Sequence, residues 1–186
     1  MLASYKKIQE HEALFEEADV AMTALKARLV ARETLAMSHS EVERLVENEG
    51  REVLRRMLQA HLEIRGRAEP VGPVVDGEGV EHTYPRTEQT RSLQTVLGPV
   101  TVERTRYEAR GAVSLVPVDA DLNLPVEEYS LEVRRRVAEL SSHVSFDAVV
   151  KEMAAHTGAP VPKRQAEELA ARAAQDRRPP RTAKAR

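Results

Sequence analysis

The chain of 186 residues contains no cysteine. This absence excludes disulfides, thiolate nucleophiles and the zinc sites that depend on cysteine ligands. Aromatic residues make up only 3% of the sequence and none is tryptophan, so the core must consist mainly of Leu, Val, Ala and Met. Those residues favour packed helices over a large β-sandwich.

The sequence also lacks a long apolar run. Nowhere do about 18 uncharged residues follow one another, the length that a membrane-spanning helix requires. The first residues, MLASYKKIQEHEALFEE, carry carboxylates where a secretory signal has its apolar segment. Together with the missing cysteines, these features predict a soluble cytoplasmic protein with no membrane partner.

Charge is unevenly distributed although the net charge is only −2. Residues 129–186 carry twelve Lys/Arg and seven Asp/Glu, a net +5, which leaves −7 for residues 1–128. A basic C-terminal third suits a polyanionic partner such as DNA. However, residues 177–186, RRPPRTAKAR, hold five of these basic groups and are expected to form a disordered tail, so 129–176 is near neutral.

Two helices are predicted in the N-terminal region, residues 1–68. In the first, apolar residues recur every seven positions, at Ile8, Phe15, Met22 and Leu29. We favour an amphipathic helix that packs inside the protein, and a coiled coil between copies, which would make the chain a homo-oligomer, is the alternative. A second helix is expected from a capping box at Ser40 and Glu43 to a stop at Gly66. Its apolar face comprises Val42, Leu45, Val46, Val53, Leu54, Met57, Leu58 and Leu62.

Residues 69–125 are predicted to form a β-hairpin region. Asp76-Gly77 is a turn signal. In RSLQTVLGPVTVERTRYEAR, apolar and polar residues alternate on both sides of 97–99, which predicts two antiparallel strands joined by a tight turn. A third strand at 113–118, VSLVPV, would complete a small sheet. The predicted fold class is therefore mainly α with a small antiparallel sheet (α+β).

Residues 126–176 are predicted to form a helix-turn-helix. One short helix is expected to follow Ser130, and another to follow Ser145, whose hydroxyl suits the N-cap position. Thr157-Gly158 should end that helix, with Gly158 in the left-handed backbone region. Pro162 suits the first position of a further helix. Two helices joined by a turn of about four residues that contains glycine form a helix-turn-helix.

The last predicted helix offers candidates for DNA recognition. One face carries Ala166, Leu169, Ala170 and Ala173 at helical spacing and is expected to be buried. The N-terminal residues of such a helix enter the major groove, where Arg pairs with guanine and Gln with adenine. The candidate DNA-binding residues are Lys163, Arg164, Gln165, Glu168 and Arg172. The same side chains also suit a solvated helix in a plain helical packing unit.

Five phrases resemble consecutive segments of the ISKra family of bacterial insertion-sequence transposases, in the family's order. They are GREVLRRMLQAHLEIR, RSLQTVLGPVTVERTRYEARG, SLVPVDADLNLP, YSLEVRRRVAELSSHVSFDAVV and TGAPVPKRQAEELA. The resemblance covers roughly residues 40 to 176. It implies the N-terminal DNA-handling region of an enzyme that cuts and joins DNA. Its acidic triad holds divalent metal on a ribonuclease-H-like domain further along the chain.

That catalytic domain has no counterpart in this sequence, which changes from AARAAQD to the basic residues 177–186. We therefore expect a truncated DNA-binding fragment, produced by a frameshift or an early stop, that recognises the terminal DNA of its element. It should hold no cofactor and should not transpose, because the metal belongs to the catalytic domain. The alternatives are a standalone helix-turn-helix transcriptional regulator and a helical scaffold that binds another protein.

No catalytic residue and no metal-binding set is predicted. Asp119 and Asp121 could be imagined as ligands of a two-metal nuclease, but a turn capped by Asp side chains explains them better. Asp76 and Glu78 flank turn glycines and have the same explanation. The six histidines share no ligand spacing, and His61 is expected at the core or boundary of its helix. The run 134–136, three arginines, suits either phosphate contacts or solvent.

Overall fold

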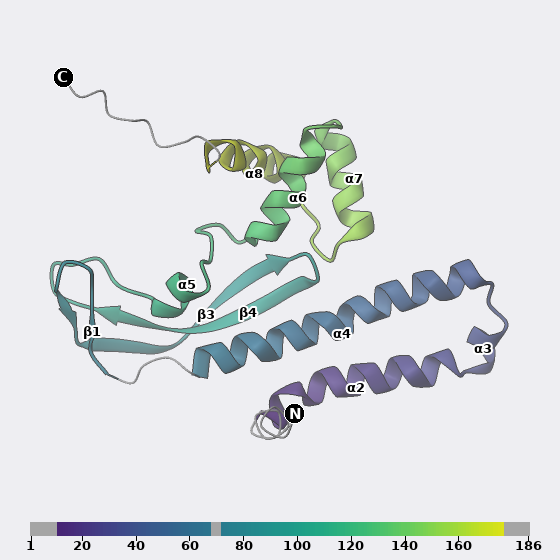
Figure 1. The fold of residues 1–186 in the computed structure, drawn as a ribbon, viewed down its shortest axis with the longest axis horizontal. Coiled ribbons are helices and arrows are strands. Elements are labelled where there is room, and N and C mark those ends of the chain that lie inside the picture. Colours follow the sequence, from purple (N-terminus) through teal and green to yellow (C-terminus); the bar gives the residue numbers. More distant parts are fainter. Residues whose placement is uncertain (1–10, 68–71, 177–186) are drawn as a thin grey trace, which may run out of the picture. The chain divides into compact units, whose positions relative to one another are not determined.

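The computed structural model describes residues 11–67 and 72–176 (Figure 1). These residues are mainly helical with a small set of antiparallel strands, which confirms the predicted α+β class. The chain divides into two compact units. The first comprises residues up to Leu93 together with Val100–Leu124, and the second comprises Gln94–Pro99 together with residues from Pro125 onward. The predicted tail at 177–186 lies outside the described residues.

The first unit begins with two long helices, α2 (Glu12–Leu29) and α4 (His39–Arg67), joined through the short α3 (Arg32–Leu35). Figure 1 shows α2 running antiparallel along α4. The contact line buries small and branched side chains from both helices, Ala18, Leu25, Val53 and Ala60. The residues that α2 buries against α4 are Ala18 and Leu25, whereas Met22 of the predicted spacing is 38% exposed and Phe15 and Leu29 are half-buried. Ile8, the first member of the predicted spacing, lies outside the described residues.

The start of α4 differs from the prediction by two residues. The capping interaction is made by Ser38, whose backbone N–H and hydroxyl both donate to Glu41 Oε2, at 2.7 and 2.6 Å. These bonds lower the pKa of Glu41, with the hydroxyl bond as the larger cause. The predicted capping box at Ser40 and Glu43 is therefore wrong. Both serines have a Glu three residues later, but Glu43 instead pairs with His39.

A short hairpin follows, formed by β1 (Val74–Val75) and β2 (Glu81–His82), which pair antiparallel. Asp76 Oδ1 accepts hydrogen bonds from the backbone N–H groups of Glu78 and Val80, both at 2.9 Å. Its other oxygen lies 3.2 Å from Nε2 of the buried His82. The bond from Val80, followed by that from His82, lowers the pKa of Asp76. The turn predicted at Asp76-Gly77 is thus present, and its aspartate serves the turn.

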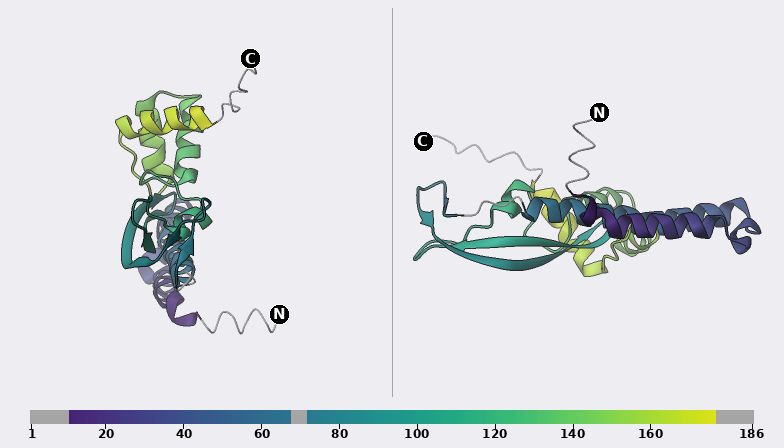
Figure 2. Two further views of the ribbon diagram at one scale, coloured as in Figure 1. Left: turned by 90° about the vertical axis from the view of Figure 1, so that its left-hand side faces the viewer. Right: turned by 90° about the horizontal axis from the view of Figure 1, so that it is seen from below.

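The main hairpin consists of β3 (Tyr84–Thr95) and β4 (Gly98–Glu108), which run as a pair in both views of Figure 2. The turn lies at Val96-Leu97, one residue before the predicted position. Thr95 Oγ1 stabilises it by donating to the Gly98 carbonyl at 2.7 Å and accepting from the Leu97 N–H at 3.2 Å. The core of the first unit lies between this hairpin, α4 and the short helix α5 (Pro117–Asp121) and includes Leu62, Leu93, Val100, Val102 and Val118.

The third strand predicted at 113–118 is wrong. The segment makes one isolated bridge, in which Leu115 exchanges backbone hydrogen bonds with Tyr107 at 2.8 and 2.9 Å. It then enters a short helix, α5 (Pro117–Asp121), with Pro117 in its first turn. Proline has no N–H to donate to a strand ladder, but it suits the first turn of a helix. The alternating pattern therefore ends where Pro117 starts a helix.

Gly66 does not end α4, contrary to the prediction, because the helix includes it and runs to Arg67. A Cβ atom at Gly66 would lie 3.0 Å from the carbonyl oxygen of Glu103 on β4. The absence of a side chain thus allows α4 to approach the strand. Gln59 reinforces the same contact, since its side chain donates to the Thr101 carbonyl at 3.0 Å and accepts from the Thr101 N–H at 2.8 Å.

The described part of the second unit contains three helices: α6 (Leu131–Ser141), α7 (Phe146–His156) and α8 (Lys163–Asp176). Ser130 caps α6 by accepting from the Val133 N–H at 3.2 Å, and Ser145 caps α7 by accepting from the Ala148 N–H at 3.4 Å. The helices predicted after both serines are therefore confirmed. The three helices share one core formed by Val133, Val137, Val149, Met153, Ala159, Val161, Ala166 and Leu169.

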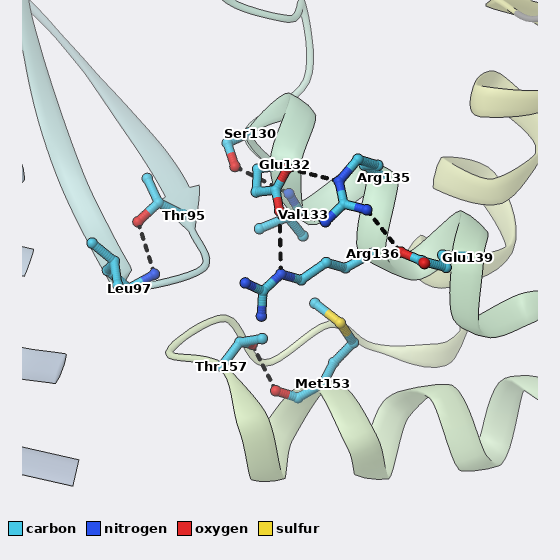
Figure 3. Close-up of polar contacts among 10 residues, drawn as sticks. All are labelled: Thr95, Leu97, Ser130, Glu132, Val133, Arg135, Arg136, Glu139, Met153 and Thr157. Atoms are coloured by element: carbon cyan, nitrogen blue, oxygen red, sulfur yellow. Dashed lines mark hydrogen bonds and ion pairs between the residues drawn. The ribbon is translucent and has the colours of Figure 1, made fainter. Parts of the chain in front are cut away.

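The connection between α7 and α8 spans residues 157–162, six rather than the predicted four. It is largely internal, because Thr157, Ala159 and Val161 are buried. Thr157 Oγ1 donates to the Met153 carbonyl at 2.6 Å (Figure 3). Helix α8 begins at Lys163, so Pro162 lies directly before the helix and not at its first position, where it was predicted. This buried connection fixes where α8 begins.

Gly158, within that connection, is not in the left-handed region, contrary to the prediction. Its N–H donates to the Val96 carbonyl at 2.9 Å, and a Cβ atom on it would lie 2.5 Å from the Leu97 carbonyl oxygen. The glycine is therefore required by close backbone packing against the hairpin turn at 94–99. No helix within the described ranges is both long and apolar enough to span a membrane.

Candidate nucleic-acid interface

The N-terminal turn of α8 carries the candidates that the sequence indicates for DNA recognition. Ala166 and Leu169 are fully buried, with exposed fractions of 0% and 2%. At about 100° per residue, Arg164 lies about 160° around the helix from Ala166, so this burial directs its side chain to solvent. Lys163, three residues before Ala166, lies near the margin of the buried face at the helix end, and both side chains are exposed. Gln165 is half-buried. The predicted buried face of α8 is thus present, and its cationic opening lies on the surface.

Both exposed cations of this turn pair with carboxylates. Lys163 Nζ lies 3.0 Å from a carboxylate oxygen of Asp147, in the first turn of α7. Arg164 Nε lies 3.1 Å from Glu168 Oε1, one helical turn further along α8. The Arg164 side chain remains 87% exposed. Solvent-exposed pairs of this kind contribute about 0 to 1 kcal/mol, so a phosphate or a guanine can compete for either cation.

Arg172 has a different environment from Lys163 and Arg164. Its Nη1 donates to Glu127 Oε2 at 2.9 Å, and Glu127 also accepts from Arg134 Nη1 at 3.1 Å. Arg134 in turn pairs with Asp176 at 2.8 Å. The Glu127 side chain is only 12% exposed, so these bonds tie α6 and α8 to the segment before α6. Arg172 thus takes part in the packing of the unit, while its side chain stays 46% exposed and its contact with DNA stays a prediction.

Arg135 and Arg136, the second and third arginines of the run on α6, pair with carboxylates of the same helix (Figure 3). Arg135 donates two bonds to Glu132, at 2.9 and 2.8 Å, and one to Glu139 at 2.8 Å. Arg136 reaches the same Glu132 at 3.3 Å. Bonds from Arg135 and then from Arg136 lower the pKa of Glu132, and the bond to Glu132 raises the pKa of Arg135. This face of α6 presents alternating charges.

The charge of the described part of the second unit, residues 94–99 and 125–176, restricts the candidate interface to a small surface. Residues 125–176 contain seven Lys/Arg and nine Asp/Glu, and residues 94–99 contain neither, so this part of the chain is at −2. Broad attraction to DNA is therefore not expected from it. The first turn of α8 is the local exception, because it contains no acidic residue. A helix N-terminus also presents the positive end of the helix dipole, which favours anions.

The carboxylates considered as metal ligands have other partners. Asp119 Oδ2 accepts from Arg104 Nη1 at 2.5 Å and lies 3.5 Å from Arg91 Nη1. Asp119 therefore pairs with strand arginines and does not cap a turn, and Asp121 is exposed in the same helix. Across residues 11–67 and 72–176, no three His, Asp or Glu side chains are grouped to hold a metal ion. His61 is exposed on α4 and lies outside the core, contrary to the prediction.

Sequence patterns did not identify the acidic partners of the candidate interface. Asp147 precedes Lys163 by 16 residues and Glu127 precedes Arg172 by 45. No local spacing links such distant pairs. By contrast, Arg164 and Glu168 are separated by four residues, a spacing that predicts an ion pair on any helix.

Comparison of the chain with protein-family models, with curated proteins and with solved structures gave no match.

Proposed function

We propose that this chain is a DNA-binding fragment of an insertion-sequence transposase that recognises the terminal DNA of its element. The proposal rests on the family resemblance of residues 40 to 176 and on one structural observation. That observation is the exposed opening of α8, with Lys163 and Arg164 in solvent and the opposite face of the helix buried in the three-helix core. Binding in the cytoplasm needs no metal or cofactor, because strand cleavage belongs to the catalytic domain.

The opening of α8 suits direct base recognition. Arg164 is the most exposed cation of the turn, and an arginine of a major-groove helix donates to guanine O6 and N7. Lys163 and the half-buried Gln165 flank it and are suited to phosphate or adenine contacts. Glu168 holds Arg164 in the unbound protein, so DNA must displace that ion pair. Recognition then depends on a few contacts at one helix end.

The test measures binding of the full chain to duplexes from the ends of the element by fluorescence anisotropy at fixed salt. Arg164→Ala should weaken binding by about 1 to 3 kcal/mol, which is about 5- to 150-fold, if the arginine pairs with a guanine. Arg44→Ala is the matched control, because it removes an exposed arginine from α4 in the first unit. Equal binding by the Arg164 variant and the parent would overturn the role of α8.

A second variant changes binding in the opposite direction. Glu168→Gln removes the carboxylate that pairs with Arg164 and one negative charge near the DNA. We expect tighter binding, because DNA no longer has to displace the ion pair and one negative charge near the phosphates is removed. The location of the preferred sequence separates the transposase fragment from a transcriptional regulator: the fragment binds inverted repeats that flank the gene, and a regulator binds an operator upstream of it.

A further inference from the structure

One side of the α2–α4 helix pair is apolar and exposed. Met22 of α2 is 38% exposed, and Val46, Leu54 and Met57 of α4 are 40%, 51% and 45% exposed. Single exposed apolar residues are common on proteins, but a continuous apolar surface marks an interaction site. The positions of these four side chains on their helices decide whether they form one continuous surface.

Helix geometry places the four side chains on the same side of the pair. Ala18 and Leu25 mark the line where α2 faces α4, and Val53 and Ala60 mark the line where α4 faces α2. A helix turns about 100° per residue, so Met22, four residues after Ala18, is rotated by about 40° from the contact line of α2. Met57, four residues after Val53, is rotated by about 40° in the same direction from the contact line of α4. Val46 and Leu54 are rotated from that line in the same direction. Because the helices are antiparallel, residues displaced in the same sense lie on the same side.

Two contacts between the helices set the alignment along their length. Arg28 forms an ion pair with Glu49, and Arg56 Nη1 donates to the Glu17 carbonyl at 3.1 Å. At this alignment Leu29 lies at the level of Val46, Met22 at the level of Leu54, and Phe15 near Met57. Phe15 and Leu29 are half-buried and occupy the same side as Met22, seven residues away on either side. The six apolar side chains therefore form one strip, which we call the apolar strip: Phe15, Met22, Leu29, Val46, Leu54 and Met57.

Polar contacts bridge the two helices on the opposite side of the pair. Arg28, Glu49 and Arg56 all lie there, displaced from the contact lines in the reverse sense, and they are joined within the chain. Glu52 lies there too and bonds to Arg56 at 2.7 Å. One side of the pair is thus closed by internal bonds and the other is apolar and uncovered within the described residues.

Gly50 lies within the apolar strip, between Val46 and Leu54 on α4. A Cβ atom there would meet nothing within 4 Å, so no neighbour in the described structure requires a glycine. Glycine in a helix interior is less favourable than alanine by about 0.5 to 1 kcal/mol. A glycine on an open helix face does, however, allow another helix to approach closely. The position is the one at which a partner helix would cross the strip.

We propose that the apolar strip is the contact surface for a second copy of this chain, with α2 of each copy lying against α4 of the other in a four-helix bundle. The seven-residue spacing of Phe15, Met22 and Leu29 is that of left-handed helix bundles. An isologous two-fold contact also requires that the surface complement itself. The charges along its edges meet this requirement.

The edges of the strip carry opposite charges at matching levels. The N-terminal half of α2 is edged by Glu12 and Asp19, and the C-terminal half of α4 by His61 and Arg65. At the other end, Lys26 of α2 faces the level of Glu47 on α4. When a two-fold axis runs along the helices, α2 of one copy lies antiparallel to α4 of the other, so each acidic edge meets a basic one. This complementarity selects a second copy over an unrelated partner.

Sedimentation equilibrium of the full chain tests the proposal. The chain should form a dimer at micromolar concentration, and Met57→Glu should raise the dimer dissociation constant at least about tenfold, because it places an unpaired charge in an apolar contact. Val20→Glu is the matched control, since Val20 is 59% exposed but points away from the strip on α2. It should leave the dissociation constant unchanged. Far-UV circular dichroism should show unchanged helix content for both variants.

Each other outcome overturns the proposal. If the chain stays monomeric up to about 100 μM, well above the concentration expected for a specific dimer, a second copy does not bind the apolar strip. A dimer that Met57→Glu does not weaken places the contact elsewhere, and equal weakening by Val20→Glu shows that the strip is not involved. If a deletion of residues 1–10 turns a monomer into a dimer, that segment is the occupant. The inference uses the first unit alone, so it survives a failure of DNA binding.

Discussion

Gly158 lies against the turn of the main hairpin so closely that a Cβ atom on it would stand 2.5 Å from the carbonyl oxygen of Leu97 and 2.6 Å from the nitrogen of Gly98. Both are backbone atoms, so neither can rotate away as a flexible side chain would. The Gly158 N–H also donates to the Val96 carbonyl at 2.9 Å, which fixes the distance between the two segments. This contact joins the α7–α8 connection to residues 94–99 within the second unit.

Gly158→Ala should therefore destabilise the second unit. We expect a loss of about 1 to 3 kcal/mol in the free energy of unfolding, the usual cost of overpacking. Denaturant unfolding followed by circular dichroism measures it. Gly77→Ala is the control, because a Cβ there meets nothing within 4 Å, and it should change stability little. An unchanged midpoint for Gly158→Ala would show that the hairpin turn is not held against the connection.

Asp119 should be more important for stability than its neighbour Asp121. Asp119→Asn removes the carboxylate that accepts from Arg104 and faces Arg91, with all three side chains largely buried. Hydrogen bonds to charged groups contribute about 1.5 to 3 kcal/mol, so we expect a loss of that order. Asp121→Asn, on the exposed side of the same helix, should have almost no effect. Thermal unfolding of the two variants compares them directly, and equal melting temperatures would contradict the assignment.

The two serines before α4 should respond differently to alanine. Ser38→Ala removes the hydroxyl that bonds to Glu41 and should cost about 0.5 to 2 kcal/mol, the usual range for a helix N-cap. Ser40 already lies inside α4, where alanine is the better helix former, so Ser40→Ala should be neutral or slightly stabilising. Denaturant midpoints of the two variants provide the measurement. If Ser40→Ala destabilises the protein more than Ser38→Ala does, the capping box lies at Ser40.

The ion pairs of Glu52 should make stability depend on pH in the acidic range. Hydrogen bonds from Arg55, and next from Arg56, lower the pKa of Glu52 from 4.5 to about 2. A carboxylate with a depressed pKa stabilises the folded state above pH 4.5 and loses that contribution as the pH falls toward 2. Since its side chain is 43% exposed, the contribution at pH 7 should stay below about 1 kcal/mol.

Glu52→Gln tests this dependence. The variant should be less stable than the parent at pH 7, and the difference should shrink as the pH falls from 4.5 to about 2. Urea unfolding at several pH values measures the difference. Glu33→Gln, which removes an exposed carboxylate from α3, serves as the comparison. A difference that does not change with pH would mean that Glu52 contributes through packing rather than charge.

Patterns that are local in sequence predicted most of the helices and the main hairpin. Ser145 was predicted as an N-cap because an N-cap bonds to a residue three positions later, and a helix was expected after Ser130, which proves to be a cap of the same kind. Alternation predicted β4 and the part of β3 from Arg91 to Thr95, because alternate residues of a strand face opposite sides. The prediction failed at Gly66 and Gly158, where glycine serves close approach to Glu103 and Leu97. The residues next to a glycine in the sequence do not predict which distant segment will pack against it.

The candidate interface was predictable only in part. The burial of Ala166 and Leu169 followed from helical spacing, and it places Arg164, on the opposite face, in solvent, whereas Lys163 is exposed at the end of the helix. Arg172 belongs to the same stretch, but its bond to Glu127 depends on how the segment before α6 returns past α8. Such pairing depends on tertiary structure. A cationic residue in a recognition helix therefore remains a candidate until its neighbours in space are known.

The assignment of residues 94–99 to the same compact unit as 125–176 has a practical consequence for dissecting the protein. Val96 packs against the three-helix core, Gln94 pairs with Tyr129, and the Val96 carbonyl accepts from Gly158. A polypeptide that starts at Pro125 omits the contributions of both hairpin residues, Gln94 and Val96, and should expose apolar surface and aggregate. A polypeptide that begins at Tyr84 restores residues 94–99, but it leaves Leu93, Val100 and Val102 without Leu62 of α4.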